Sequence, residues 1–382
     1  MKSSLLLTLR YLSFHRVQTS LLVAAISVTI FLPIAVESLV QRYDSTLRTR
    51  ARATPLVIGA KGNRFDVVLT ALYFRTTPVE PTTAGEARKI RESGLAEAIP
   101  IHTRYTARGF PLVGTTLDYF DFRRLSLRRG HLPRILGQAV LGSQVAQKLN
   151  LSPGDSLPSD PQNLYDLAAA YPLKLHIVGV LQETGSSDDD AVFIDVQTAW
   201  VIDGIGHGHQ NLTANAKDTR RVEATAALPQ YQEITRENLA SFHRHGDPDT
   251  FPLTAILAIP NSVKSATLLK ARTHASETVQ ILVPTEVVGE LMSVVLRIQQ
   301  FLNANFVLVL FSTLLFLTLI GWLSQRMRRR EFETMHRIGC HRSTVIQLLV
   351  TEWALIFLAS SILAGAGILL TVYLLPNLIL GA

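Results

Sequence analysis

The stretch FLNANFVLVLFSTLLFLTLIGWLSQ, residues 301–325, contains no charged residue and is followed at once by the arginine-rich segment RMRRREFETMHRIGCHR, residues 326–342. A helix needs about 20 consecutive apolar residues to cross the hydrocarbon layer of a membrane, and these 25 residues are enough. Arginine accumulates on the cytoplasmic flank of membrane helices, and the following segment carries six arginines. The stretch therefore predicts a membrane span that ends in the cytoplasm.

Two other stretches have the same character. Val17–Val36 is 20 residues long and Trp353–Ala382 is 30 residues long, and neither contains a charged residue. Lys2, Arg10 and Arg16 precede the first stretch, so the amino terminus is expected in the cytoplasm. Three crossings from that side leave the carboxyl terminus outside.

The composition agrees with a membrane protein that carries one large polar domain. Of the 382 residues, 47% are hydrophobic and only 18% are charged, where soluble proteins have about 25%. The net charge of +7 comes largely from arginines beside the apolar stretches, which argues against nucleic-acid binding. A wholly soluble enzyme is excluded, and the single cysteine, Cys340, permits no internal disulfide.

The predicted fold is an α-helical membrane domain of three spans with a large α+β domain outside the cytoplasm, carried on helical stalks. Leucines clustered along one side of the amino-terminal segment predict a helix lying in the cytoplasmic interface. Apolar residues at helical spacing continue past the first span and precede the second, which predicts two stalk helices. The expected segments are an interfacial helix at 1–16, spans at 17–40, 301–325 and 348–375, stalk helices at 41–53 and 285–300, the outer domain at 54–284, a cytoplasmic loop or helix at 326–347 and an outer carboxyl terminus at 376–382.

Within the outer domain, short apolar runs alternate with glycine, proline and aspartate. Gln138–Leu141 is expected to be a strand and Ser143–Leu149 a short helix. Short strands mixed with short helices are typical of an α+β module, which we expect in two lobes. Ser186–Asp190 reads SSDDD and lacks the spacing of a calcium loop, so we expect a hairpin turn there.

Four histidines of the outer domain are candidate metal ligands. Histidine is a frequent ligand of zinc and copper when three or four donors converge. Spaced histidines in glycine-rich segments are more often found in solvated loops, and we expect no metal, cofactor or catalytic residue in the chain. The candidates are His207, His209, His243 and His245.

The sequence has no motif that would supply chemistry of its own. It contains no Gly-x-x-x-x-Gly-Lys-Ser/Thr nucleotide loop, no Gly-x-Ser-x-Gly elbow and no His-Glu-x-x-His pair. The predicted spans have no charged residue at mid-depth, although ion-coupled carriers need such groups. The chain is therefore not expected to be an enzyme, and it must obtain energy from a partner or only bind.

Residues 328–340, RRREFETMHRIGC, together with Glu352 at the start of a span, resemble the cytoplasmic loop of FtsX/MacB-type ABC transporter permeases. Residues 138–143, 151–155 and 177–194 are similar to the periplasmic core domain of that family. The resemblance implies a permease in the bacterial inner membrane whose loop forms a coupling helix on a separate cytoplasmic ABC ATPase. It also implies a second permease copy or paralogue and, in some systems, a periplasmic accessory or substrate protein. Family members have four spans, and the fourth is expected to be absent here.

The resemblance assigns the ATPase contact to one amphipathic helix, Arg330–Gln347. Apolar anchors surrounded by charges are how such a helix docks in a groove of a partner. Gly339 would allow either close backbone approach or a helix end. The residues expected at the ATPase are Arg330, Glu331, Met335, Arg337, Ile338 and Gly339.

Two other functions remain open. One is an FtsX-like regulatory subunit that activates an envelope hydrolase and moves no solute. The other is a membrane-anchored metal-binding or sensor protein that uses the histidines. The sequence does not identify a transported substrate.

Overall fold

The computed structural model describes residues 2–161, 172–208, 233–274 and 276–379. The chain forms two compact units. One unit is built from Met1–Ser45 and Met292–Ala382, and the other from Thr46–Leu291. The unit boundary falls inside two long helices, α2 and α9, which run unbroken through it.

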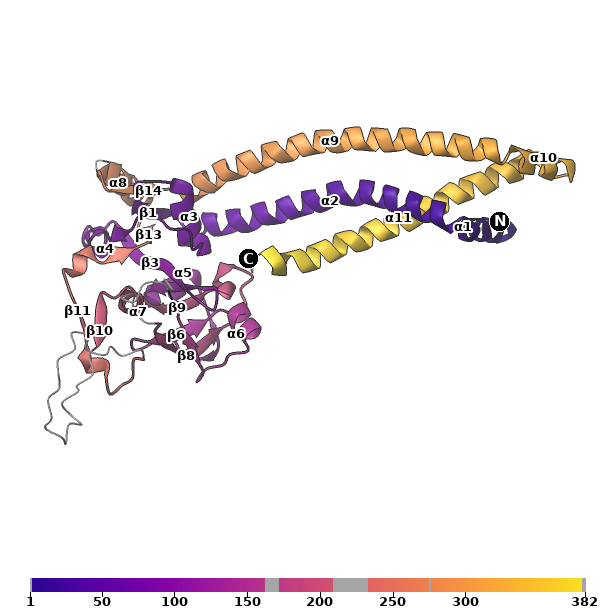
Figure 1. Ribbon diagram of the computed structural model, residues 1–382. Coiled ribbons are helices and arrows are strands. Elements are labelled where there is room, and N and C mark those ends of the chain that lie inside the picture. The colour runs from indigo at the N-terminus through magenta and orange to yellow at the C-terminus, as the bar shows by residue number, and fades with distance from the viewer. Residues whose placement is uncertain (1, 162–171, 209–232, 275, 380–382) are drawn as a thin grey trace. The chain divides into compact units, whose positions relative to one another are not determined.

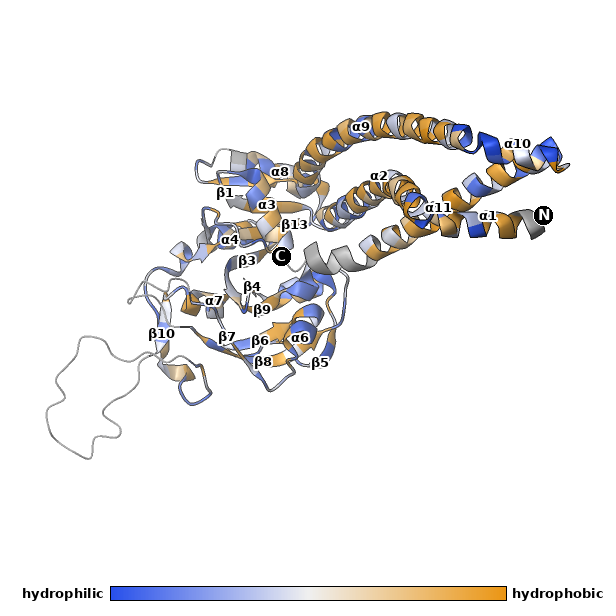
Figure 2. Cartoon of the chain, turned by 45° about the vertical axis from the view of Figure 1, so that its right-hand side comes forward, coloured by the Kyte–Doolittle hydropathy of each residue, from blue (hydrophilic) through white to orange (hydrophobic). Residues whose placement is uncertain are grey.

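Within the described residues, three helices are long and apolar enough to cross a membrane: α2 (Arg16–Arg52), α9 (Pro284–Met327) and α11 (Arg342–Ile379). Figure 2 shows apolar residues along all three and polar residues on the short helix α10 (Arg329–Arg337). A further helix, α1 (Lys2–Phe14), packs against α11. The predicted fold class, three membrane helices and a mixed α/β domain, is confirmed.

The lengths of α2 and α9 show that each predicted stalk helix is continuous with a predicted membrane span. At about 1.5 Å per residue, the 37 residues of α2 and the 44 of α9 extend for about 55 and 66 Å. The hydrocarbon layer is only about 30 Å thick. Each helix therefore continues well beyond a membrane without a break.

The three long helices pack through a small apolar core. Ile26, Leu317 and Ile356, one from each helix, are buried against one another. Beside them Ser360 is fully buried, and the Ser27 hydroxyl donates to its carbonyl at 3.1 Å. Because serine is small and can hydrogen-bond across helices, it permits close helix contact inside a membrane.

The loop after α9 differs from the expectation. We predicted one helix over Arg330–Gln347, but α10 ends at Arg337 and α11 begins at Arg342. Gly339 lies between them with φ +96°, in the left-handed region that a continuous helix does not permit. The third long helix also continues to Ile379, beyond the predicted limit of the span at residue 375.

The other unit is built on a ten-stranded mixed sheet (Figure 1). The strand order is β14-β1-β13-β3-β4-β9-β6-β8-β5, and β7 pairs with β8. Two small two-stranded ladders, β10–β11 and β12–β2, are separate from its hydrogen-bonded strands. The elements are β1 (Leu56–Ala60), α3 (Arg64–Tyr73), β2 (Thr82–Thr83), α4 (Ala84–Glu92), β3 (Ala96–Ala107), β4 (Phe110–Thr115), α5 (Leu117–Arg123), β5 (Leu127–Gly130), β6 (Gln138–Leu141), α6 (Ser143–Leu149), β7 (Ser156–Pro158), β8 (Lys174–Leu181), 3₁₀ helix η1 (Ser187–Asp190), β9 (Val192–Asp195), α7 (Val196–Ile202), β10 (Gly206–Gly208), η3 (Leu239–Ser241), β11 (Phe242–Arg244), η4 (Pro248–Thr250), β12 (Pro252–Leu253), β13 (Ala255–Pro260), α8 (Val263–His274) and β14 (Val279–Leu282).

Two apolar clusters of described residues are part of the core of this unit. One gathers around β6, β8 and β9 and includes Leu141, Ile177 and Ile194. The other gathers around β1 and β13 and includes Ile58 and Ile256. The twelve-residue strand β3 contributes to both clusters and joins the two halves of the sheet. The strand and the helix predicted at 138–141 and 143–149 are present with those bounds.

Candidate functional site

The residues that the sequence assigned to an ATPase contact lie on and just after α10. Arg330, Glu331 and Arg337 are exposed on the helix, and Met335 is half-buried. Ile338, the residue that follows α10, is 80% exposed. Ile338 is thus an exposed apolar side chain surrounded by charged residues.

Gly339 ends α10 by a specific backbone arrangement. Its amide donates to the carbonyl of His336 at 3.1 Å, and the amide of Cys340 donates to that of Met335 at 3.0 Å. These two bonds, with a residue at positive φ between them, form a Schellman motif. Among the described residues, apart from Gly339 and its two chain neighbours, no atom lies within 4 Å of the position where a Cβ would be added. Gly339 is therefore required by the backbone turn and not by crowding.

Arg328 fixes the position of α10 within its unit. Its Nη1 donates to Oε2 of Glu352 on α11 at 2.9 Å, and its guanidinium lies 3.8 Å from the ring centroid of Tyr11 on α1. Its Nε is 3.6 Å from Oε2 of Glu331. Arg328 and Glu352 are each only 17% exposed. One side chain thus connects α1, α10 and α11, and we call this contact the Arg328 junction.

The last turn of α2 carries a second charged contact, inside the other unit. Both terminal nitrogens of Arg50 donate to the carboxylate of Asp188 on η1, at 2.7 and 2.9 Å. The Tyr119 hydroxyl on α5 accepts from Arg50 at 2.8 Å and donates to Asp188 at 2.6 Å. The side chains of Arg50 and Asp188 are 8% and 3% exposed. We call these three residues the Arg50 cluster.

Charge pairing in the Arg50 cluster outweighs burial. Burial alone would raise the pKa of Asp188, but the adjacent Arg50 guanidinium and the Tyr119 hydroxyl lower it below its usual value. Burial would likewise lower the pKa of Arg50, but Tyr119 and Asp188 raise it above its usual value. The pKa of Tyr119 is raised, mainly by burial. The pair is therefore ionised and holds the end of α2 to η1.

The prediction of a hairpin turn at Ser186–Asp190 is wrong. The segment forms η1, and the two strands that flank it, β8 and β9, do not pair with each other because β6 lies between them. Asp189 is buried and accepts from the amides of Thr184 and Gly185. The carboxylates of Asp188 and Asp189 are buried, and each one accepts hydrogen bonds from neighbouring donors.

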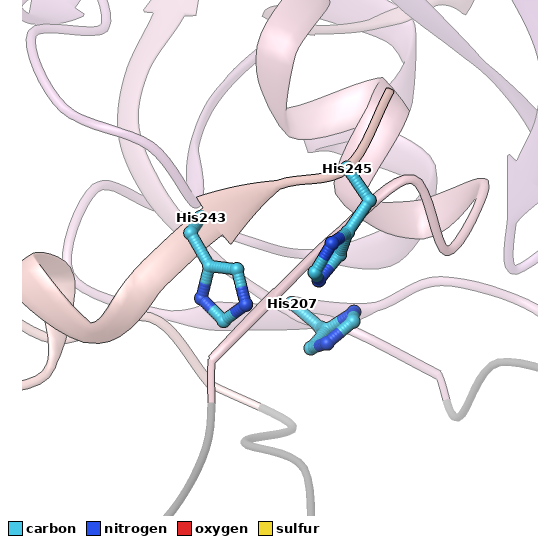
Figure 3. Close-up of side chains that lie close together, drawn as sticks. All are labelled: His207, His243 and His245. Carbon is cyan, nitrogen blue, oxygen red and sulfur yellow. The ribbon is translucent and has the colours of Figure 1, made fainter.

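Three of the four candidate histidines converge. His207 on β10 and His243 on β11 are paired residues of one ladder, and His245 follows two positions later (Figure 3). Their ligand nitrogens all lie within 4.8 Å of one another. His209 lies outside the described residues.

Sequence reasoning missed the Arg328 junction and the Arg50 cluster. Arg328 stood out only as one of several arginines, and nothing in the sequence linked it to Tyr11. Arg50 and Asp188 are 138 residues apart. The available signal was an arginine next to the end of an apolar helical stripe, and an acidic run too rich in charge for a simple turn.

Two family models match the chain. One is described as the MacB-like periplasmic core domain and matches residues 19–229; the other is described as FtsX-like permease C-terminal and matches residues 303–381. No curated protein sequence gives a significant match to the chain.

Two solved structures are similar to part of the chain. One is the extracellular domain of the noncanonic ABC-type transporter YknZ from Gram-positive bacteria, with 14% identity and a TM-score of 0.34 over 60% of this chain and 99% of that one. The other is the periplasmic region of MacB from Actinobacillus actinomycetemcomitans, with 12% identity and a TM-score of 0.36 over 63% and 94%.

Proposed function

Because the chain belongs to the family of FtsX/MacB-type ABC transporter permeases, we propose that it couples ATP hydrolysis by a separate cytoplasmic ATPase to movement of its extracytoplasmic domain. As a permease of this family it is a component of an ABC transporter in the inner membrane. The coupling would serve the export or extraction of a substrate outside the bilayer. The amino terminus and α10 would face the cytoplasm, and the carboxyl terminus the outside.

The observation that carries the proposal is the shape of the loop around α10. Ile338 is an exposed apolar residue at the end of a short charged helix, and the turn at Gly339 and the Arg328 junction both fix it. A preordered apolar anchor binds a groove at a lower entropic cost than a flexible one. These features support docking of α10 on an ATPase, with Met335 as a second apolar contact and Arg330, Glu331 and Arg337 as the charged rim.

The length of α2 supports a mechanical role. Helix α2 is continuous over 37 residues, and its last turn is held by the buried pair of Arg50 and Asp188. A displacement of α2 caused by the ATPase would thus act on the sheet through η1 and α5. In this proposal two permease copies, or one copy and a paralogue, act together.

The test is co-purification of the ATPase with Ile338→Asp. A buried carboxylate at the contact is costly, so we expect the ATPase to be lost while the permease itself remains folded and in the membrane. Val263→Asp is the matched control, because Val263 is 87% exposed on α8 of the other unit. An unchanged yield of ATPase with Ile338→Asp would overturn the docking assignment.

A further inference from the structure

The small ladder β10–β11 carries three histidines on one face. His207 lies directly opposite His243 in the antiparallel register. His245 is two residues beyond His243, and side chains two apart along a strand point to the same face. The ring centroids are 5.0 Å apart for His207 and His243, 4.9 Å for His207 and His245, and 4.7 Å for His243 and His245 (Figure 3).

The opposite face of the ladder is packed on the protein. Phe242 contacts the apolar cluster around β6, β8 and β9. Arg244, two residues later, donates from Nη1 to Oε1 of Gln197 at 2.9 Å. A Cβ at Gly208 would lie 2.8 Å from the Phe242 ring, so a larger residue there would require this ring to move. One face of the ladder thus contacts the rest of the unit, and the other face carries the imidazoles.

One hydrogen bond holds the backbone of His245, and another holds the ring of His243. The amide of His245 donates to the carbonyl of Ile205 at 3.1 Å, which extends the ladder by one bond beyond β11. Nδ1 of His243 lies 3.1 Å from the carbonyl oxygen of Ser241. Since a carbonyl can only accept, Nδ1 is the donor in this contact. A bond of this kind to the second nitrogen is the usual support of a metal-binding histidine.

We propose that His207, His243 and His245 bind one zinc ion on the outer face of this ladder. Zinc–nitrogen bonds of 2.0–2.1 Å place the nitrogens of a tetrahedral site about 3.4 Å apart. The three imidazoles here, within 4.8 Å of one another, reach that spacing by small side-chain rotations. Three neutral nitrogen donors favour zinc, copper(II) or nickel(II) over magnesium or calcium.

The three histidines fill three of the four positions of a tetrahedral site. His243 and His245 are exposed and His207 is half-buried, so a water molecule or a donor from another protein can complete the tetrahedron. A bound ion would join the segment around β10 to the segment around β11 and thereby stabilise the ladder. This property is independent of the proposed coupling to an ATPase.

The experiment is a zinc titration of the full chain in detergent, with a chromophoric chelator as competitor. We expect one equivalent of zinc to bind saturably to the wild-type chain. Replacing both exposed ligands, His243→Asn and His245→Asn, should weaken binding more than about 100-fold, or about 2.8 kcal/mol. His131→Asn is the control, because His131 is an exposed histidine of the same unit outside the ladder. The zinc affinity of this variant should match that of the wild type.

Two further readouts keep the test independent of folding defects. Zinc should raise the thermal unfolding midpoint of the wild-type chain, since a ligand of the folded state stabilises it, and should not do so for the double variant. Cobalt(II), used in place of zinc, should give the intense visible absorption of a four-coordinate site. No saturable binding, equal affinity in the double variant, or a six-coordinate cobalt spectrum would each overturn the proposal.

Discussion

The guanidinium of Arg50 is buried and has its charge balanced by Asp188, so neither residue can be changed alone without cost. Removing one partner of a buried ion pair leaves an uncompensated charge and costs about 3–5 kcal/mol. Replacing both by apolar residues of similar size is often neutral for stability. The contribution to the free energy of unfolding therefore belongs to the pair and not to either residue alone.

Asp188→Asn should lower the thermal unfolding midpoint of the chain, and Arg50→Met combined with Asp188→Leu should restore most of it. Asp249→Asn is the matched control, because Asp249 pairs with Arg88 and their side chains are 34% and 59% exposed, respectively. Such surface pairs contribute only about 0.2–1 kcal/mol to stability. Equal shifts for Asp188→Asn and Asp249→Asn would contradict the assignment of a buried charge pair.

The lowered pKa of Asp188 also predicts a pH dependence. A carboxyl whose pKa is depressed in the folded state stabilises the protein above its unfolded pKa of about 3.9. That contribution is lost as the pH falls through the lower, folded pKa. The midpoint of the wild type should thus decrease below about pH 4 more steeply than that of the Arg50→Met, Asp188→Leu variant, measured by differential scanning fluorimetry. Parallel pH curves would contradict this.

At the scale of elements, the position of α10 depends on the Arg328 junction. Arg328 contacts Glu352 of α11 and Tyr11 of α1, and both pairs combine a charge with partial burial. Helix α10 has only nine residues, too few to be stable alone in water. Its orientation is therefore set by this contact and by the Schellman turn at Gly339.

Glu352→Gln should weaken the binding of the ATPase without unfolding the membrane helices. The amide keeps the shape but loses the charge-assisted bond to Arg328, which contributes about 1.5–3 kcal/mol. The readout is the yield of ATPase in co-purification. The exchanged pair Arg328→Glu with Glu352→Arg should regain part of it, whereas a yield as low as that of Arg328→Glu alone would speak against the junction.

At the scale of the whole molecule, the orientation of the chain can be measured at a single native atom. Cys340 is the only cysteine of the chain, and it is exposed directly after Gly339. If α10 faces the cytoplasm, a membrane-impermeant maleimide should label Cys340 only after the inner membrane is permeabilised. Val263→Cys in a Cys340→Ser background should be labelled in intact spheroplasts, because Val263 is exposed in the extracytoplasmic unit. Labelling of Cys340 in intact spheroplasts would reverse the proposed topology.

Features that add up along the chain follow from the order of the amino acids alone. Three charge-free stretches identified the apolar helices, and residues 138–149 showed the pattern of a short strand and a short helix. The resemblance of residues 328–340 to a family loop indicated the family. These signals are local, because hydrophobic length and periodicity depend only on neighbouring residues.

The contacts between distant residues, in contrast, follow from the way the elements pack. Arg50 reaches Asp188, Arg328 reaches Tyr11, and His207 lies opposite His243 because of helix packing and strand register. A shift of one residue in that register would move the histidine to the other face of the ladder. Gly339 was compatible with either a close approach or a helix end, and its positive φ decided for the end. Such contacts depend on the packing of whole elements, which no local pattern encodes.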